Sequence, residues 1–307
     1  MRVLVTGGAG FIGSHVVDGL VAAGHQVAVL DDLSTGRREN LRDDVAFHEV
    51  DLRDRAGVHG VLASFQPEVV SHQAAQTSVA VSAREPVLDA EINVVGSLHL
   101  LDGCVEHGVK RVVFASTGGA IYGEVKAPAR AQLDWVPKPL SPYACSKLAV
   151  ERYLDVYRHE HGLGSTVLRY ANVYGPRQDP HGEAGVVAIF AERLLKGEPI
   201  RINAMREEGD DGCVRDYVFV DDVVKANLAA VAGEVQGTLH VATGVETRTK
   251  DIADALIAAL GVECTPGRGP RRAGDLERSV LEPEARFGTP LGLDEGLKKT
   301  AEWFRGR

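Results

Sequence analysis

Along the first two-thirds of the chain, short continuous runs of hydrophobic residues alternate with segments of helical spacing. The runs are RVLVTG (2–7), HQVAVLDD (25–32), VAFHEVDL (45–52), EVVSHQAA (68–75) and RVVFAST (111–117). Helical spacing fills intervals such as 14–24, 54–65 and 87–107. Apolar strands joined by helices predict a parallel sheet covered on both faces. Right-handed crossovers make that sheet doubly wound, so we expect an α/β fold of Rossmann type.

The rhythm changes after about residue 170. A Pro/Gly-rich loop, YGPRQDPHGEAG, is followed by further helical segments and by an irregular basic loop, TPGRGPRRAGD. We therefore expect a Rossmann domain over 1–170 and a smaller α/β substrate lobe over 171–307. Residues 212–240 are expected to return to the first domain.

Composition narrows the class of protein. The net charge of −9 disfavours a general nucleic-acid binder, but local arginines can still hold an anionic substrate. The four cysteines are far apart and form no CxxC pair, which is typical of reduced thiols. No HExxH is present, and His159 and His161 point to different helix faces, so no metal site is expected. Without a leader-like segment or a long apolar run, we expect a cytoplasmic protein that does not enter a membrane.

The segment TGGAGFIGSH carries a dinucleotide-binding signature. Gly7, Gly10 and Gly13 have GxxGxxG spacing, and the segment follows a strand and opens a helix. The next strand ends at Asp31, eighteen residues after Gly13, where an acid bonds a ribose hydroxyl and repels a 2′-phosphate. NAD is therefore favoured over NADP, although Arg37 and Arg38 follow in the next turn.

Two further strand ends belong to the expected cofactor site. Asp51 follows the third strand and is expected near the adenine. Gln73, Ala74, Ala75 and Gln76 follow the fourth strand, where small residues let a cofactor lie close to the backbone.

The segment SPYACSK predicts a helix with Ser141 as N-cap and Pro142 as first residue. Tyr143 and Lys147 then share one face. A free tyrosine has a pKa of about 10 and is a poor base at neutral pH. A lysine ammonium and the positive nicotinamide ring would both favour the phenolate, so we expect Tyr143 to act as a general base.

Motifs spread over nearly the whole chain resemble those of extended short-chain dehydrogenases/reductases, and within them the NAD-dependent UDP-sugar epimerases of the UDP-glucose 4-epimerase type. They are TGGAGFIGSH, LDDLSTG, HQAA, FASTGGAIYGE, SPYACSK, LRYANVYGPRQ, VRDYVFVDD and RRAGDL. The resemblance implies that NAD stays bound and that Tyr143 takes the proton of the sugar 4-hydroxyl. Hydride passes to NAD⁺, the 4-keto sugar turns over, and hydride returns to its other face.

The resemblance also implies site residues. The cofactor set is Gly7, Gly10, Phe11, Ile12, Gly13, Asp31, Asp32, Ser34, Thr35, Gly36, Asp51, Leu52, Gln73, Ala74, Ala75, Gln76, Asn93, Tyr143, Lys147 and Tyr170. The substrate set is Thr117, Tyr143, Asn172, Gly185, Val186, Val187, Arg215, Arg272 and Asp275, with Arg215 and Arg272 as diphosphate ligands.

One position departs from the family. Similar enzymes carry a Ser or Thr where this chain has Gly118, so the hydroxyl that bonds the sugar is expected from Thr117 or from Ser116. Sugar-nucleotide dehydratases carry an acid pair at Gly119 and Ala120, and its absence argues against water loss here.

The sugar is less strongly defined. Ser279 is small where related pockets are narrowed by a bulky residue, which leaves UDP-GlcNAc/UDP-GalNAc open beside UDP-glucose/UDP-galactose. Asp179 stands where glucuronate epimerases tend to have an arginine. The ranking is therefore UDP-glucose, UDP-GlcNAc, then UDP-glucuronate. Similar proteins form homodimers through helices matching about 87–107 and 143–161.

Overall fold

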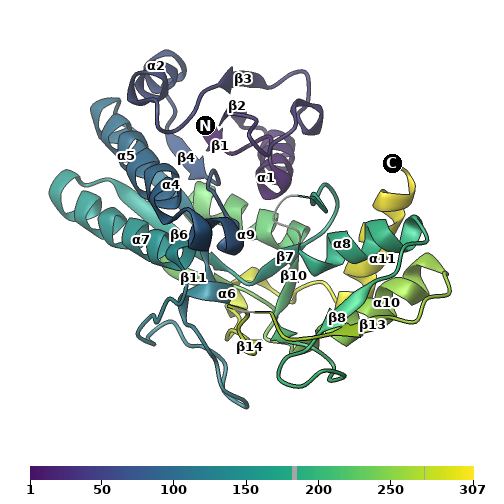
Figure 1. Cartoon of the computed structure of the whole chain (residues 1–307). Helices are drawn as coiled ribbons and strands as arrows, with labels where there is room; N and C mark the ends of the chain where they lie inside the picture. The colour runs from purple at the N-terminus through teal and green to yellow at the C-terminus, as the bar shows by residue number, and fades with distance from the viewer. Residues whose placement is uncertain (182–184, 273) are drawn as a thin grey trace. The chain divides into compact units, whose positions relative to one another are not determined.

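The centre of the fold is a seven-stranded sheet, seen in a computed structural model that describes residues 1–181, 185–272 and 274–307 (Figure 1). From edge to edge its strands are β11 (Gly237–Val241), β6 (Gly164–Tyr170), β5 (Arg111–Thr117), β4 (Val69–His72), β1 (Arg2–Thr6), β2 (Gln26–Asp31) and β3 (Ala46–Glu49). The pairs β1–β2, β1–β4, β2–β3 and β4–β5 are all parallel. The predicted doubly wound fold is confirmed, and the strand order reverses between β1 and β4, where ligands of such sheets bind.

Helices cover both faces of this sheet. They are α1 (Phe11–Ala22), α2 (Arg55–Phe65), α3 (Val79–Arg84), α4 (Pro86–Ala90), α5 (Gly96–Glu106), α7 (Pro142–His161) and α9 (Val220–Ala232), with a 3₁₀ turn η1 (Arg38–Asn40). The helices α1 and α9 pack together, with Gly19 against Val224. The other face is covered by α2, α5 and α7 (Figure 1).

The core beneath α2, α5 and α7 is made of aliphatic side chains that reach zero exposure. Leu4 from β1, Leu62 from α2, and Leu100 and Leu101 from α5 are among them. Burying such a side chain contributes about 1.5–3 kcal/mol. This packing fixes the strand ends from which the candidate site is built.

The helix expected over 87–107 is interrupted by one π-helical turn. The segments α4, η2 (Glu91–Val95) and α5 follow one another without a break, and η2 has π geometry. Such turns often occur at functional sites. Asn93 lies in this turn and is buried.

The chain divides into two compact units. The first unit comprises Met1–Thr117, Pro139–Arg169 and Val223–Leu239, and the second comprises Gly118–Lys138, Tyr170–Asp222 and His240–Arg307. The segment 118–138, which sequence reasoning assigns to the first domain, groups with the second unit. Of the expected return over 212–240, residues 223–239 lie in the first unit.

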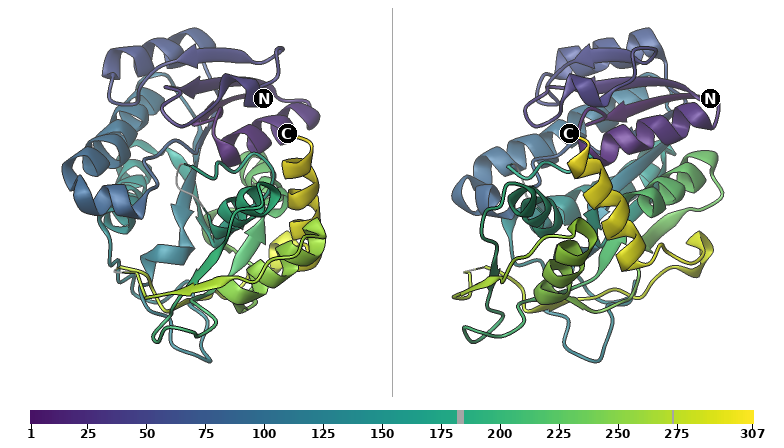
Figure 2. Two further views of the ribbon diagram at one scale, coloured as in Figure 1. Left: turned by 45° about the vertical axis from the view of Figure 1, so that its right-hand side comes forward. Right: turned by 90° about the vertical axis from the view of Figure 1, so that its right-hand side faces the viewer.

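The second unit is built from short strands and three packed helices. Its elements are α6 (Gly118–Ile121), β7 (Asn172–Tyr174), α8 (Val186–Leu195), β8 (Arg201–Asn203), β9 (Val214–Arg215), β10 (Tyr217–Phe219), β12 (Thr247–Arg248), α10 (Thr249–Leu260), β13 (Gly267–Gly269), β14 (Arg278–Ser279), η3 (Ala285–Phe287) and α11 (Leu293–Arg305). The helices α8, α10 and α11 lie side by side (Figure 2). A three-stranded sheet, β12-β9-β14, carries Arg215 and Ser279. Within the described ranges, no helix combines the length and the apolar character that crossing a membrane requires.

Candidate functional site

The glycine turn after β1 is confirmed, and its glycines have different physical reasons. Gly7 has φ +66°, and a Cβ there would lie 2.6 Å from the backbone of Ala74. A Cβ on Gly13 would collide with the carbonyl oxygen of Gly7. A Cβ on Gly10 would meet only that oxygen, at 3.3 Å, and otherwise open space. Gly10 therefore leaves room beside the N-terminus of α1, where a pyrophosphate fits.

The N-terminus of helix α1 has no side chain that would compete with a bound anion. Its N-cap is Gly10, no side chain caps it, and its first turn contains no acid. Phe11 and Ile12 start the helix and are half-buried. The free N–H groups and the positive end of the helix dipole favour a phosphate here. The residues present therefore fit the dinucleotide that the motif predicts.

Asp31 ties the second strand to the glycine turn. Its carboxylate accepts hydrogen bonds from the amides of Ala9 and Leu33, both at 2.9 Å. Burial raises the pKa of Asp31. Gly36 is required nearby, because a Cβ there would lie 2.7 Å from an Asp31 oxygen. Next to it, Asp32 accepts from the amide and hydroxyl of Ser34.

The basic residues after this turn have protein partners. Arg37 pairs with Glu39 at 3.5 Å, and Arg38 lies over the ring of Phe47. Their positions give no sign of a site built for a 2′-phosphate. Thr35 lies in the same exposed turn.

The Asp51 side chain pairs with a residue of its own turn, Arg53. Arg53 donates to it from its guanidinium and from its amide, and this pairing lowers the pKa of Asp51. Its neighbour Leu52 is buried and packs against Gly96 of α5. A role for Asp51 at the adenine therefore requires it to bind while paired with Arg53.

The residues after β4 are held by a buried polar network. The amide of Gln76 donates to Asn93 at 2.8 Å, and Asn93 returns a bond to the Gln76 carbonyl at 2.7 Å. Asp89 accepts from both side-chain amides and from the hydroxyl of Ser146 on α7. The π turn thus fixes the strand end, where Ala75 is half-buried.

The beginning of the same segment is fixed from β1 and α9. Gln73 donates to Asn227 at 3.0 Å, and the Ala74 amide donates to the Thr6 hydroxyl at 3.3 Å. Both ends of the segment Gln73–Gln76 are therefore anchored inside the first unit.

Helix α7 begins as the sequence predicts. Pro142 is its first residue, and the Ser141 side chain accepts from the amide of Ala144 at 3.2 Å. Lys147 is only 3% exposed. Its Nζ donates to the Ala115 carbonyl of β5 at 2.9 Å and lies 6.0 Å from the centroid of the Tyr143 ring. The half-buried phenol therefore stands beside a fixed cation.

The two candidate hydroxyls at the end of β5 have different surroundings. Ser116 is buried, and its hydroxyl donates to Glu151 at 2.6 Å. Thr117 is half-buried, and its hydroxyl has no hydrogen bond to any residue that the structure describes. The Ser116 hydroxyl is thus buried and already bonded within the protein, which favours Thr117 as the hydroxyl available to a ligand.

Sequence reasoning missed an ion pair beneath α7. Glu151 lies one turn after Lys147 and accepts from Arg169 of β6 at 2.9 and 2.6 Å, as well as from Ser116. All three residues are buried. The i+4 spacing from Lys147 was the only signal in the sequence.

His72 was also missed, although it lies within the quoted HQAA. It bonds Thr6 at 2.7 Å through Nδ1 and Ser97 at 2.9 Å through Nε2. Burial, and then the charge of Lys147, lower the pKa of His72 to about 3. His72 is therefore neutral at any ordinary pH and adds no positive charge to that of Lys147.

In the second unit, the predicted diphosphate ligands gather around Cys213. Burial raises the pKa of the Cys213 thiol, while the charges of Arg215 and Arg272 lower it and that of Asp275 raises it. Arg215 donates to the carbonyls of Val214 at 2.9 Å and Leu276 at 2.7 Å. Two guanidinium groups and one carboxylate are thus brought together.

Arg272 is 65% exposed and pairs with Asp275 at 2.9 Å. Two of the predicted substrate ligands, Arg272 and Asp275, are thus paired with each other. A phosphate would have to replace or join the carboxylate at this guanidinium, as charge-assisted bonding allows.

The remaining predicted substrate residues lie on β7 and α8. Asn172 donates from its side chain to the Asp216 carbonyl at 3.1 Å. Gly185 is the N-cap of α8, and Val186 is half-buried. Val187 is fully buried among the helices, so it contributes to packing. Tyr170, predicted for the cofactor, is the buried last residue of β6.

Two residues bear on sugar choice. Ser279 is buried, and its hydroxyl donates to the Gly119 carbonyl at 2.9 Å, which joins β14 to α6. Asp179 accepts from the amide of His181 at 3.0 Å. The adjoining residues 182–184, within the loop named above, lie outside the described residues.

A sheet of this strand order, with a glycine turn after β1 and an acid at the end of β2, defines a dinucleotide-binding protein of Rossmann type. The chain belongs to the NAD dependent epimerase/dehydratase family, whose pattern matches residues 3–242. The predicted family is thereby confirmed.

Comparisons with individual proteins agree. A UDP-glucose 4-epimerase of Mycolicibacterium smegmatis is 47% identical over 100% of this chain and 99% of its own length. The crystal structure of Thermus thermophilus UDP-glucose 4-epimerase in complex with NAD has a TM-score of 0.96 and 54% identity, covering 100% of this chain and 99% of its own. The Thermotoga maritima enzyme with UDP-glucose has a TM-score of 0.94 and 47% identity, with the same coverage.

Proposed function

We propose that this chain is a UDP-glucose 4-epimerase that interconverts UDP-glucose and UDP-galactose with tightly bound NAD. The observation that carries the proposal is the buried Lys147, fixed by Ala115 and placed beside the Tyr143 ring. Relatives with full-length identity of 47% or more carry that name, and one is solved with NAD. The first unit is proposed to hold the cofactor and the second to bind the nucleotide.

Bound NAD would supply reversible two-electron oxidation of carbon 4 of the sugar. Gly7, Gly10 and Gly13 would admit its pyrophosphate to the N-terminus of α1, and Asp31 would bond its ribose.

The chemical work of the protein is a proton transfer. The Lys147 ammonium lies in a buried site, where a nearby cation stabilises a phenolate strongly. Tyr143 would accept the proton of the sugar 4-hydroxyl and return it after the sugar turns over. Thr117 would bond the same hydroxyl and orient it. His72 stays uncharged, so the cation that acts on Tyr143 from this unit is Lys147.

Recognition of the diphosphate is assigned to Arg215 and Arg272. The charges of both arginines lower the pKa of the Cys213 thiol, so both guanidinium groups lie near this residue. Arg215 is oriented by main-chain carbonyls, whereas Arg272 is exposed. Asp275 would bond the ribose, and Asn172 would bond the phosphate region.

The test uses UDP-galactose and UDP-GalNAc in separate reactions without added NAD, with products resolved by NMR. We expect UDP-glucose from the first. Tyr143→Phe should lose at least about 10²-fold in rate, since general-base catalysis is removed. Tyr153→Phe is the matched control, because Tyr153 is an exposed tyrosine on the same helix and phenylalanine keeps the apolar ring for the dimer surface proposed below. No epimer from folded protein, even with NAD supplied, would refute the proposal.

A second candidate is epimerisation of UDP-GlcNAc and UDP-GalNAc, favoured by the small side chain of Ser279. Conversion of UDP-GalNAc in the same test would support it. UDP-glucuronate ranks third because of Asp179. A dehydratase is disfavoured, since Gly119 and Ala120 provide no acid or base for water loss, whereas a net NAD-dependent sugar-nucleotide oxidoreductase stays an alternative. Water loss or net formation of NADH would establish one instead.

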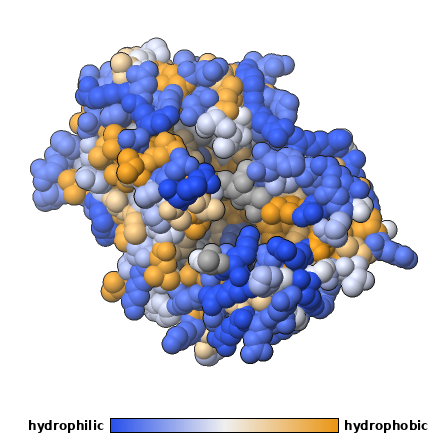
Figure 3. All heavy atoms as spheres, viewed as in Figure 1, coloured by the Kyte–Doolittle hydropathy of each residue, from blue (hydrophilic) through white to orange (hydrophobic). Residues whose placement is uncertain are grey.

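We also propose a cytoplasmic homodimer. Apolar side chains gather on the surface where α4 and α5 lie (Figure 3). Val87, Val95, Val105, Tyr153 and Val156 are exposed on α4, η2, α5 and α7. A patch of this kind marks an interaction site. Sedimentation of the wild type and of Val87→Glu tests it: a monomeric wild type, or an unaltered dimer, would count against this surface. The four free cysteines agree with a reducing compartment.

A further inference from the structure

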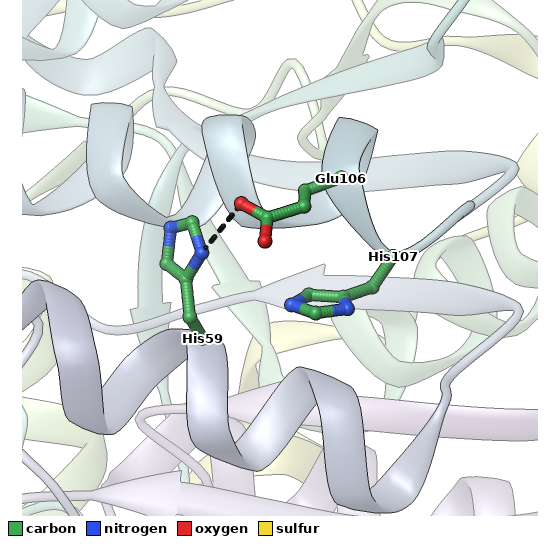
Figure 4. Close-up of side chains that lie close together, drawn as sticks. All are labelled: His59, Glu106 and His107. Atoms are coloured by element: carbon green, nitrogen blue, oxygen red, sulfur yellow. Dashed lines mark ion pairs between the residues drawn. The ribbon is translucent and has the colours of Figure 1, made fainter.

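Two helices of the first unit, α2 and α5, bring together a ligand set that shares no residue with the candidate site described above. His59 lies on α2, and Glu106 and His107 lie at the end of α5 (Figure 4). One ligand atom from each lies within 4.8 Å of the others. The His59 Nδ1 is 3.1 Å from an oxygen of Glu106.

The helix packing holds this cluster in place. A Cβ on Gly103 of α5 would lie 2.5 Å from Leu62 and 3.3 Å from the His59 ring, so α5 approaches α2 closely there. The rings of His59 and His107 meet edge to face, with centroids 5.8 Å apart. His59 is 13% exposed, and its position is therefore set by packing.

One ring nitrogen of His107 at this cluster, Nε2, is buried and lacks a hydrogen-bond partner among the described residues. The Nε2 atom of His59 also lacks a partner among these residues, but it lies on the side of its ring away from Glu106, which is bonded by Nδ1 (Figure 4). Buried polar atoms ordinarily have partners. Figure 4 shows the ring nitrogen of His107 farthest from its backbone below the Glu106 carboxylate, on the side of the ring nearer His59. This nitrogen has a lone pair available in one of its tautomers, and it lies within 4.8 Å of the ligand atoms of His59 and Glu106.

We propose that His59, Glu106 and His107 form a binding site for a divalent transition metal, Zn²⁺ first, that links α2 to α5. Two imidazoles and one carboxylate are a zinc ligand set that leaves the fourth position open to water. Tetrahedral bonds of about 2.0–2.1 Å place ligand atoms roughly 3.3 Å apart. The separation of 3.1 Å between His59 and Glu106 already fits. Glu106 is 60% exposed, so its side chain is free to adjust for the remaining ligand.

The site is distinct from the proposed chemistry, and its role is structural. A metal that binds the native state and not the unfolded chain stabilises the folded state, and the stabilisation grows with the logarithm of the metal concentration once the site is filled. The link would restrain α2 against α5, whose connection leads to β5 and Thr117. Epimerase activity does not depend on it, so activity and metal binding are separable readouts.

The experiment uses the full chain without an affinity tag, treated with a chelator and dialysed. Co²⁺ is added as a spectroscopic probe, and Zn²⁺ affinity is measured by competition with a coloured chelator. We expect one equivalent of Co²⁺ with visible absorption of a four-coordinate site, displaced by Zn²⁺. Zn²⁺ should also raise Tm by a few degrees. Epimerisation should be unchanged by the chelator.

The variants test the ligands one by one. Glu106→Gln removes an exposed carboxylate and should fold normally, while His107→Gln removes an imidazole. Each should weaken Zn²⁺ binding by at least about tenfold, since even outer-shell changes cost 10–100-fold. His159→Gln is the control, because His159 is an exposed histidine on α7 that pairs with Glu160 at 3.5 Å and belongs to no three-ligand group among the described residues. Absence of stoichiometric binding by the wild type, or equal binding by all variants, would overturn the site.

Discussion

Lys147 in the first unit and Arg272 in the second are both cations with a predicted role in ligand binding, and their surroundings are opposite. Lys147 is buried, and its ammonium is fixed by a backbone carbonyl and lies over the Phe114 ring. Arg272 is exposed, and its partner Asp275 is three residues away in the same loop. The buried cation is held in place before a ligand arrives. The exposed Arg272 loses side-chain conformational freedom, or exchanges Asp275 for the ligand, when the ligand binds.

The same contrast extends to the neighbouring residues. In the first unit, Gln76, Asn93 and Asp89 satisfy one another beneath the surface. In the second, Arg271 and Arg206 share Glu277 at the surface. Preorganised groups contribute most to a transition state, and adjustable groups contribute mainly to binding. Changes in the first unit should therefore act on kcat, and changes in the loop on KM.

The largest expected effect is that of Lys147→Met. Methionine fills the buried site with similar length but removes the cation, so the phenolate of Tyr143 loses its stabilisation. We expect kcat for UDP-galactose to fall by about 10²–10⁴-fold with KM little changed. Steady-state NMR or coupled assays measure it, with Tm as the control for folding. A KM effect without a kcat effect would remove the contrast between the units.

The second effect concerns acid stability of the first unit. His72 has a native pKa of about 3, below its unfolded value of 6.5. Between these values the unfolded chain binds one more proton, so stability is complete above pH 6.5 and is lost as pH falls toward 3. At pH 5 the loss is about 2 kcal/mol from this residue.

Urea unfolding at pH 7 and pH 5 checks this expectation. His72→Gln keeps a polar side chain but does not titrate, so its stability should fall less between the two pH values. Equal losses in the wild type and the variant would show that other groups dominate the acid response.

The smallest effect is that of Arg272→Ala. Removing one exposed guanidinium should raise KM about tenfold and change kcat little, since its bond to phosphate forms in the ground state as well. Arg271→Ala is the matched control, because Arg271 lies next to it and pairs with Glu277 at 3.4 Å. Equal effects of the two substitutions would indicate general charge attraction and not a specific ligand.

Local features of the fold follow well from the sequence. The glycine turn, Asp31 at a strand end and the Ser141–Pro142 start of α7 depend on residues close together in the chain, and each is present. Their causes are local: backbone space, capping and proline geometry.

Features that depend on packing could not be predicted in the same way. The pair Glu151–Arg169 requires that α7 and β6 meet, and His59 meets His107 only because α2 lies against α5. The segment 118–138 leaves the first unit although its sequence has no marked boundary. The hydrogen bond from Ser116 to Glu151 depends on the direction of the Ser116 side chain, which the sequence does not define. The roles of the site residues remain predictions, which the substitutions above test.

The π turn at Glu91–Val95 has a consequence for how this helix tolerates insertions and deletions. An α-helix advances about 100° per residue, so the extra residue in a π turn sets the phase between the helix before it and the helix after it. Deleting one residue there would restore uniform α-helix, yet it would rotate α4 relative to α5 and carry Asn93 away from Gln76. The length of this helix is thus as constrained as its composition, and a family member shortened by one residue would need a different anchor for the end of β4.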